Sequence, residues 1–160
     1  MKKTFFPTLI LRHRKENLKM CSLHGLEGRS DLRFFTYPTD SLPPLDQCLL
    51  LAVDAPPLSI EDQSMPLLLI DGTWNYAAVM ERQLPQTTQW VRRSLPKHLT
   101  TAYPRKQTAC PDPSRGLASV EALYAAHHLL GYSTEGLLDH YYWKDLFLKA
   151  NPSIDTYKAF

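Results

Sequence analysis

Apolar residues gather in short runs along the first half of the chain. Such runs cover residues 8–12, 32–37, 48–53 and 67–70, and a weaker one covers residues 98–103. The Leu-rich runs among them do not alternate with polar residues, which indicates strands that are buried on both faces. Most of the prolines lie outside these runs, as strand interiors require. The pattern predicts a central, mostly parallel sheet.

Helical spacing of apolar residues appears between these runs and dominates the second half. Residues 15–23 and 75–84 predict helical crossovers between parallel strands. Residues 118–130 predict a helix that Gly131 ends, and residues 134–150 predict another that stops before Pro152. We therefore expect an α/β part over residues 1–97 and a mainly helical part over residues 98–160, joined in one compact unit.

The segment Asp71-Gly72-Thr73-Trp74 follows the apolar run at residues 67–70 and precedes a predicted helix. Thr73 is a suitable N-cap for that helix. Ligands of open parallel sheets bind at the carboxyl ends of the strands, so Asp71 and Trp74 are expected at the mouth of a cleft. The alternative is an ordinary turn, in which Asp71 satisfies helix N–H groups and Trp74 fills the core.

Composition excludes several classes of protein. Of the 160 residues, 44% are hydrophobic and 21% charged, and no apolar run approaches the ~20 residues of a membrane span, so we expect a cytoplasmic protein. Three cysteines and six histidines show no spacing typical of a disulfide framework or a metal site. The motifs G-x-S-x-G, G-x-G-x-x-G and the P-loop are absent.

Positive charge is concentrated although the formal net charge is only +2. One group lies within residues 12–19 and a second within residues 92–115, and both follow predicted strand ends on the face where Asp71 is expected. Such groups suit contacts to nucleic-acid phosphates, and the alternative is a set of solvated loop charges. Cys21 lies near Lys19, so a nucleophilic thiolate is a second, less favoured chemistry.

The helix start at residues 116–122 is the remaining candidate feature. Backbone N–H groups at such a start hold carboxylates, and Glu121 in the first turn either serves a site or caps the helix.

These segments together resemble the aminocarboxypropyltransferases that act on RNA. Asp71-Gly72-Thr73-Trp74 is similar to the D-x-T-W signature of the DTW-domain family, which modifies tRNA uridines, and residues 105–107 and 118–122 match its other motifs. The layout is more similar to the small-subunit rRNA aminocarboxypropyltransferase family. The segments that match its pattern are residues 58–62, 71–74, 93–96, 103–104, 117–122 and 143–151.

The resemblance implies a SPOUT-like α/β fold with a trefoil knot, followed by a helical C-terminal part. It also implies S-adenosylmethionine as the cofactor and transfer of its 3-amino-3-carboxypropyl group to a uridine or pseudouridine of RNA. Asp71 is the expected catalytic residue, which holds the amino group or accepts the base proton. The cofactor residues expected are Ser22, Val53, Asp71, Thr73, Trp74, Ala77, Leu117 and Ser119.

The RNA partner, small-subunit rRNA or tRNA, is expected to contact basic side chains of a monomer without metal. These residues are Arg14, Lys15, Arg92, Arg93, Arg105 and Lys106. The chain differs from the rRNA family at Tyr103, where the family has Asn, and residues 13–22 match the N-terminal motif of the family only in part. Three alternatives stay open: a SPOUT RNA methyltransferase, a non-catalytic RNA-binding module, and an α/β scaffold with inert basic loops.

Overall fold

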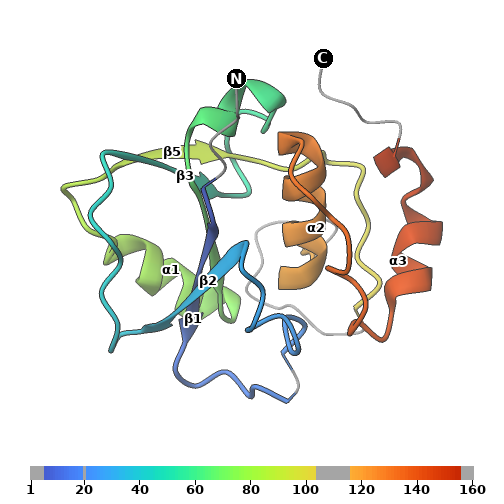
Figure 1. The fold of residues 1–160 in the computed structure, drawn as a ribbon, viewed down its shortest axis with the longest axis horizontal. Helices are drawn as coiled ribbons and strands as arrows, with labels where there is room; N and C mark the ends of the chain where they lie inside the picture. Colours follow the sequence, from blue (N-terminus) through green and yellow to red (C-terminus); the bar gives the residue numbers. More distant parts are fainter. Residues whose placement is uncertain (1–5, 20, 104–115, 156–160) are drawn as a thin grey trace.

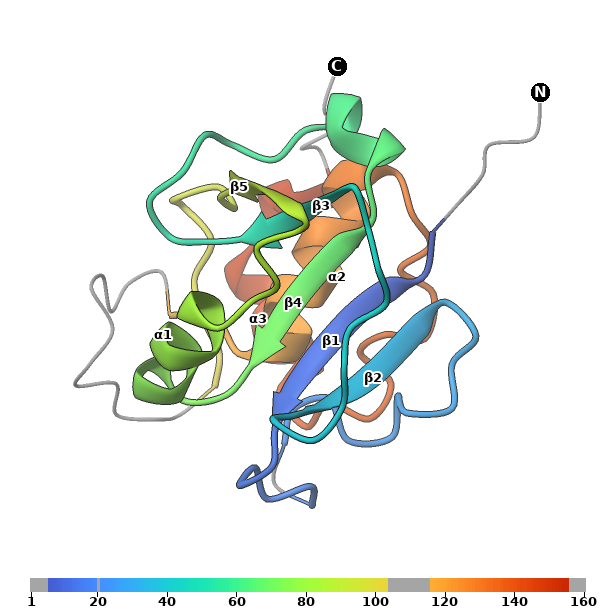
Figure 2. The ribbon, with the colours of Figure 1, turned by 90° about the vertical axis from the view of Figure 1, so that its left-hand side faces the viewer.

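The centre of the fold is a five-stranded, all-parallel sheet (Figure 2). The computed structural model describes residues 6–19, 21–103 and 116–155. The strands are β1 (Thr8–His13), β2 (Leu32–Tyr37), β3 (Gln47–Leu51), β4 (Leu67–Asp71) and β5 (Gln89–Arg93), and their order is β2-β1-β4-β3-β5. The predicted α/β class and parallel sheet are confirmed.

Helices cover both faces of this sheet, which explains why the central strands show no polar alternation. Helix α1 (Trp74–Arg82) lies on one face, and α2 (Ser119–Leu130) and α3 (Lys144–Ala150) lie on the other (Figure 1). Along β1, Leu9 and Leu11 pack with Met80 of α1, whereas Ile10 packs with Leu123 of α2. Successive residues of a strand point to opposite faces, so both sets are buried.

The register of the central strands brings Arg12 and Asp71 together. Arg12 of β1 pairs with Asp71 of β4, at the carboxyl ends of both strands. Both side chains are buried at that edge, with residue exposures of 7% and 4%. The edge at which the sequence predicted a ligand cleft therefore contains a buried charge pair.

Two predicted helix boundaries are confirmed. Thr73 is the N-cap of α1, and its hydroxyl accepts from the Tyr76 N–H. Gly131 ends α2 with φ of 74°, in the left-handed region that glycine adopts without the steric penalty of a Cβ.

The fifth strand differs from the prediction. The prediction of a strand at residues 98–103 is wrong, and β5 instead lies at Gln89–Arg93. This edge strand is rich in polar residues, so it does not form the apolar run by which the other strands were predicted. The backbone of the 98–103 segment bonds to side chains instead. Thr100 N–H donates to Asn151 Oδ1 at 2.7 Å, Asn151 Nδ2 donates to the Thr100 carbonyl at 2.8 Å, and Ala102 N–H donates to Glu121.

Two predicted helices are shorter or absent in the described residues. Residues 15–19 and 22–28 consist of turns and irregular backbone, so the connection from β1 to β2 contains no helix there. Within the predicted helix at 134–150, only α3 is helical, because Gly136 has φ of 77° and short turns follow it. The 3-10 helices η1 (Ile60–Ser64) and η3 (Pro152–Asp155) complete the fold. No helix among the described residues has the length and apolar character needed to cross a membrane.

Candidate ligand pocket

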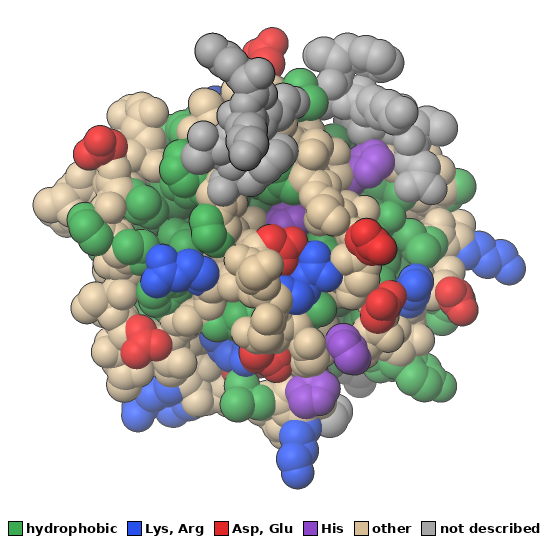
Figure 3. All heavy atoms as spheres, viewed as in Figure 1, with side chains coloured by type: hydrophobic (Ala, Val, Ile, Leu, Met, Phe, Trp, Pro, Cys, Tyr) green, Lys and Arg blue, Asp and Glu red, His purple; other side chains and the backbone are tan. Residues whose placement is uncertain are grey.

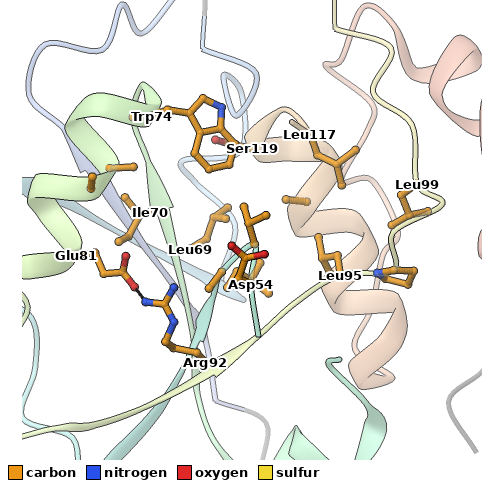
Figure 4. Close-up of a pocket in the computed structure, with 18 residues that line it drawn as sticks. Asp54, Leu69, Ile70, Trp74, Glu81, Arg92, Leu95, Leu99, Leu117 and Ser119 are labelled. Carbon is orange, nitrogen blue, oxygen red and sulfur yellow. Dashed lines mark hydrogen bonds and ion pairs between the residues drawn. The ribbon is translucent and has the colours of Figure 1, made fainter. Parts of the chain in front are cut away.

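A cavity of about 340 Å³ lies between α1 and α2, above the carboxyl ends of β3 and β4 (Figure 4). Small-ligand pockets have volumes of about 300–1,000 Å³, so the cavity suits a ligand of nucleoside size. Most of its lining is apolar, with Leu69 and Ile70 on one side and Leu95 and Leu117 on the other. The location is that expected for ligands of open parallel sheets.

Polar groups mark the two ends of this pocket. Trp74 and Ser119 lie at one end, and Glu81, Arg92 and Asp54 lie toward the other (Figure 4). Five of the eight predicted cofactor residues line the pocket, namely Val53, Trp74, Ala77, Leu117 and Ser119. The other three, Ser22, Asp71 and Thr73, are not among the lining residues.

Asp71 lies behind the pocket wall, and both of its carboxylate oxygens are occupied. Oδ2 accepts from Arg12 Nε at 3.1 Å and from the Cys21 thiol at 3.2 Å. Oδ1 accepts from the Ser119 hydroxyl at 2.7 Å. The alternative of a plain turn residue, with Asp71 bonded to helix N–H groups, is therefore wrong. Asp71 is linked to the pocket by its hydrogen bond with Ser119, which is a lining residue.

The environment of Arg12 and Cys21 completes this buried cluster. The Arg12 guanidinium also lies 4.7 Å from the centroid of the Phe34 ring, a cation–π distance. Burial first, and then the charge of Asp71, raises the pKa of the Cys21 thiol to about 12. A reactive cysteine needs a thiolate near neutral pH, so the interpretation of Cys21 as a nucleophile is wrong.

The first turn of α2 forms the wall next to Ser119. Ser22 belongs to this region, because its hydroxyl accepts from the Val120 N–H at 3.1 Å. Glu121 is fully buried and accepts from four donors, which include Ala118 N–H at 2.8 Å and Tyr141 OH at 3.0 Å. Its role is therefore to cap α2 and to tie neighbouring segments to the helix. The Ser119 N–H has no hydrogen-bond partner among the residues that the structure describes.

The basic residues predicted to hold RNA have different surroundings. Arg14 and Lys15 are exposed beyond the carboxyl end of β1. Arg92 forms an ion pair with Glu81, and Arg93 pairs with Asp62 at 3.3 Å. On the face seen in Figure 3, basic and acidic side chains are interspersed. The last two predicted RNA contacts, Arg105 and Lys106, lie outside the described residues.

Comparison with known proteins gives one informative result. No model of a protein family matches the chain, and neither does any curated protein sequence. The structure is similar to that of the SAM-dependent rRNA:acp-transferase Tsr3 from Vulcanisaeta distributa, with a TM-score of 0.70 and 22% sequence identity. The match covers 95% of this chain and 83% of that chain. The two proteins share a fold.

Two charged residues of the pocket were not predicted, although the sequence contains a signal for each of them. Asp54 directly follows the apolar run at residues 48–53, the same signal that drew attention to Asp71. Glu81 follows Trp74, Ala77 and Ala78 at helical spacing, and all four side chains line the cavity. No group of three or more His, Cys, Asp or Glu side chains in the described part of the chain is arranged to hold a metal ion.

Proposed function

We propose that this protein transfers the 3-amino-3-carboxypropyl group of S-adenosylmethionine to RNA, with small-subunit rRNA as the substrate. The observation that carries the proposal is the pocket between Trp74 and Asp54, in a fold shared with a SAM-dependent rRNA:acp-transferase. The proposal includes the SPOUT-like knotted topology, a cytoplasmic monomer without metal, and two parts that meet at residues 97 and 98. The all-parallel sheet is compatible with that topology.

The residues of the pocket fit the proposed cofactor. S-adenosylmethionine has a charged amino-acid end, a sulfonium centre and a nucleoside, and the cavity has two polar ends separated by apolar walls. We place the amino-acid end at Ser119 and the first turn of α2, where the unpartnered N–H and the helix dipole favour a carboxylate. The nucleoside then extends toward Asp54 and Glu81.

Hydrogen bonding defines what Ser119 offers to a ligand. Its hydroxyl proton is donated to Asp71, so the lone pairs of Oγ remain for a donor such as an ammonium group. Asp71, held by Arg12 and Cys21, fixes this orientation. Asp71 is therefore proposed as a positioning residue, because both of its oxygens are occupied and it does not line the pocket. Ser22 contributes by fixing the Val120 N–H at the same helix start.

Orientation is the chemistry that the protein must supply. When bound, S-adenosylmethionine would provide a carbon activated by its positively charged sulfur, which takes the electron pair of the broken C–S bond, leaves as neutral methylthioadenosine and needs no general acid. Trp74 and Ala77 form an apolar wall that excludes water and fixes which carbon of the sulfonium meets the RNA. The proton of the attacking nitrogen leaves to solvent.

RNA is proposed to approach from the carboxyl edge of the sheet. Arg14 and Lys15 are exposed there and suit phosphate contacts. Arg92 and Arg93 already have carboxylate partners, so their contribution to RNA binding requires that these ion pairs open. Arg105 and Lys106 are retained in the proposal as predicted contacts.

The test of function is product analysis. The purified protein is incubated with small-subunit rRNA or tRNA and with S-adenosylmethionine labelled either in the methyl or in the aminocarboxypropyl group. We expect label in rRNA nucleosides only from the aminocarboxypropyl group, together with methylthioadenosine. S-adenosylhomocysteine as product would indicate a methyltransferase, and label in tRNA alone would move the substrate to the DTW type. No binding of the cofactor in calorimetry would indicate an RNA-binding module without this activity.

A further inference from the structure

The nucleoside end of the pocket contains three charged side chains, and only two of them neutralise each other. Arg92 of β5 and Glu81 of α1 form an ion pair at the pocket wall. Asp54, three residues past the end of β3, lines the same region. Its carboxylate makes no hydrogen bond or ion pair with any side chain or backbone group of the described residues.

A carboxylate at an apolar pocket offers acceptors and no donors. In Figure 4 the Asp54 side chain lies between Leu69 and Leu95, on the side of Glu81 and Arg92 and away from Ser119. Asp54 is an exposed residue, so a ligand that fills the pocket meets a hydrated carboxylate and must replace the hydrogen bonds of any water that it displaces from the pocket side. The matching ligand group is therefore one that presents donors at its nucleoside end.

We propose that Asp54 accepts hydrogen bonds from the ribose hydroxyls of the bound nucleoside and thereby selects a ribonucleoside ligand. This inference rests on the proposed function, because that function places the nucleoside at this end of the pocket. A ribose presents two neighbouring O–H donors, which match the two oxygens of a carboxylate. In dinucleotide-binding sheets an acidic side chain beyond a strand end recognises ribose in the same way.

Other groups of the cofactor match Asp54 less well. The adenine edge combines its amine donor with ring nitrogens, whose lone pairs a carboxylate repels. The ammonium group belongs to the amino-acid end, which the Ser119 hydroxyl and the start of α2 occupy. The ribose is the part of the nucleoside whose two neighbouring groups are both donors.

The experiment compares ligands that differ at the ribose, bound to variants that differ at Asp54. Isothermal titration calorimetry of the full chain measures affinity for 5′-methylthioadenosine and for its 2′-deoxy and 3′-deoxy analogues. The variants are Asp54→Asn and, as a matched control, Asp46→Asn, an exposed residue just before β3 at the opposite edge of the sheet. Circular dichroism verifies that each variant is folded.

The wild type is expected to bind at least one deoxy analogue about 10- to 100-fold more weakly than 5′-methylthioadenosine. Asp54→Asn is expected to weaken binding of 5′-methylthioadenosine by a similar factor and to bind the deoxy analogue with the same affinity. Asp46→Asn should behave as the wild type does. This non-additive pattern would establish contact between Asp54 and the ribose.

Three outcomes would overturn the inference. Unchanged affinity in Asp54→Asn would remove Asp54 from the ligand site. If the loss of affinity caused by Asp54→Asn and the loss caused by the deoxy analogue are additive, Asp54 contacts another part of the ligand. A loss for S-adenosylmethionine but not for 5′-methylthioadenosine would assign Asp54 to the sulfonium or ammonium. In these three cases the wild type still binds the cofactor. If the proposed function itself is wrong, the wild type binds neither S-adenosylmethionine nor 5′-methylthioadenosine.

Discussion

Replacement of Asp71 by Asn tests the buried cluster behind the pocket. The substitution keeps the shape of the side chain but leaves the Arg12 guanidinium buried without a counter-charge, since the two side chains are only 8% and 6% exposed. Breaking a buried pair in this way costs about 3–5 kcal/mol. For a chain of this size, that loss corresponds to a decrease in Tm of about 6–20 °C. The variant should remain folded, because domains are stable by about 5–15 kcal/mol.

Urea unfolding followed by circular dichroism measures the loss. The double variant Arg12→Met with Asp71→Asn should recover much of the stability, because it removes both charges and retains volume beside Phe34. A free energy of unfolding for Asp71→Asn within about 0.5 kcal/mol of wild type, as for a surface substitution, would refute the reasoning.

The same variant also separates two roles of Asp71 in transfer. If Asp71 acts by orienting Ser119, then Asp71→Asn and Ser119→Ala should each weaken binding of S-adenosylmethionine, and the double variant should be little worse than either alone. If Asp71 accepts the base proton directly, the rate of transfer should fall while cofactor affinity is retained. Calorimetry and single-turnover kinetics distinguish these results.

Three further predictions concern the pocket, the RNA face and pH. Trp74→Ala should weaken cofactor binding by about 1–3 kcal/mol in calorimetry. Because the indole is half-buried, its removal should cost less stability than the ~3–5 kcal/mol expected for a core tryptophan. A larger loss of stability with unchanged cofactor binding would show that Trp74 is structural. Arg14→Ala with Lys15→Ala should flatten the dependence of log RNA affinity on log salt by ~1.4–1.8 units, whereas Lys149→Ala on α3 should not. Burial lowers the pKa of His127, so the unfolded chain binds a proton below about pH 6.5 that the native protein does not. Stability should therefore decrease as the pH drops below 6.5, and His127 contributes up to about 1.4 kcal/mol per pH unit to this slope. The pKa of His13 is lowered too, by burial and by the charges of Lys15 and Arg14, so His127→Gln should reduce the slope of unfolding free energy against pH and not abolish it.

The parallel sheet and its principal helices were predictable because the signals for them are local. The run Leu67-Leu68-Leu69-Ile70 has no polar alternation, and the structure buries it between two layers of helices. Thr73 and Gly131 mark helix ends through their own side chain and backbone properties. The elements that failed depend on distant partners. The backbone of residues 98–103 is held by Asn151 and Glu121, which local propensity does not reveal.

The site shows the same division between local and long-range information. The sequence located Trp74, Ala77 and Leu117, since the turn after β4 and the start of α2 are recognisable segments that both reach the cavity. The sequence predicted that Asp71 follows a strand end, but it did not predict the contacts that occupy the Asp71 carboxylate. These contacts come from β1, from α2 and from the segment after β1. The Arg12 contact depends on strand register, and the Cys21 and Ser119 contacts depend on how distant segments pack, which local sequence patterns do not specify. The division of the chain at residues 97 and 98 stays a prediction.

The strand order also constrains how the protein is made. β1 lies between β2 and β4, and its partner residue Asp71 is 59 residues downstream of Arg12. At synthesis rates of about 5–20 residues per second, the ribosome needs about 3–12 seconds to deliver that partner. During this interval the nascent chain carries a first strand that is fully buried in the native fold, with one edge unpaired and with Arg12 lacking its counter-ion. The centre of the sheet is thus completed late, which makes the N-terminal half the part of the nascent chain most in need of protection from aggregation.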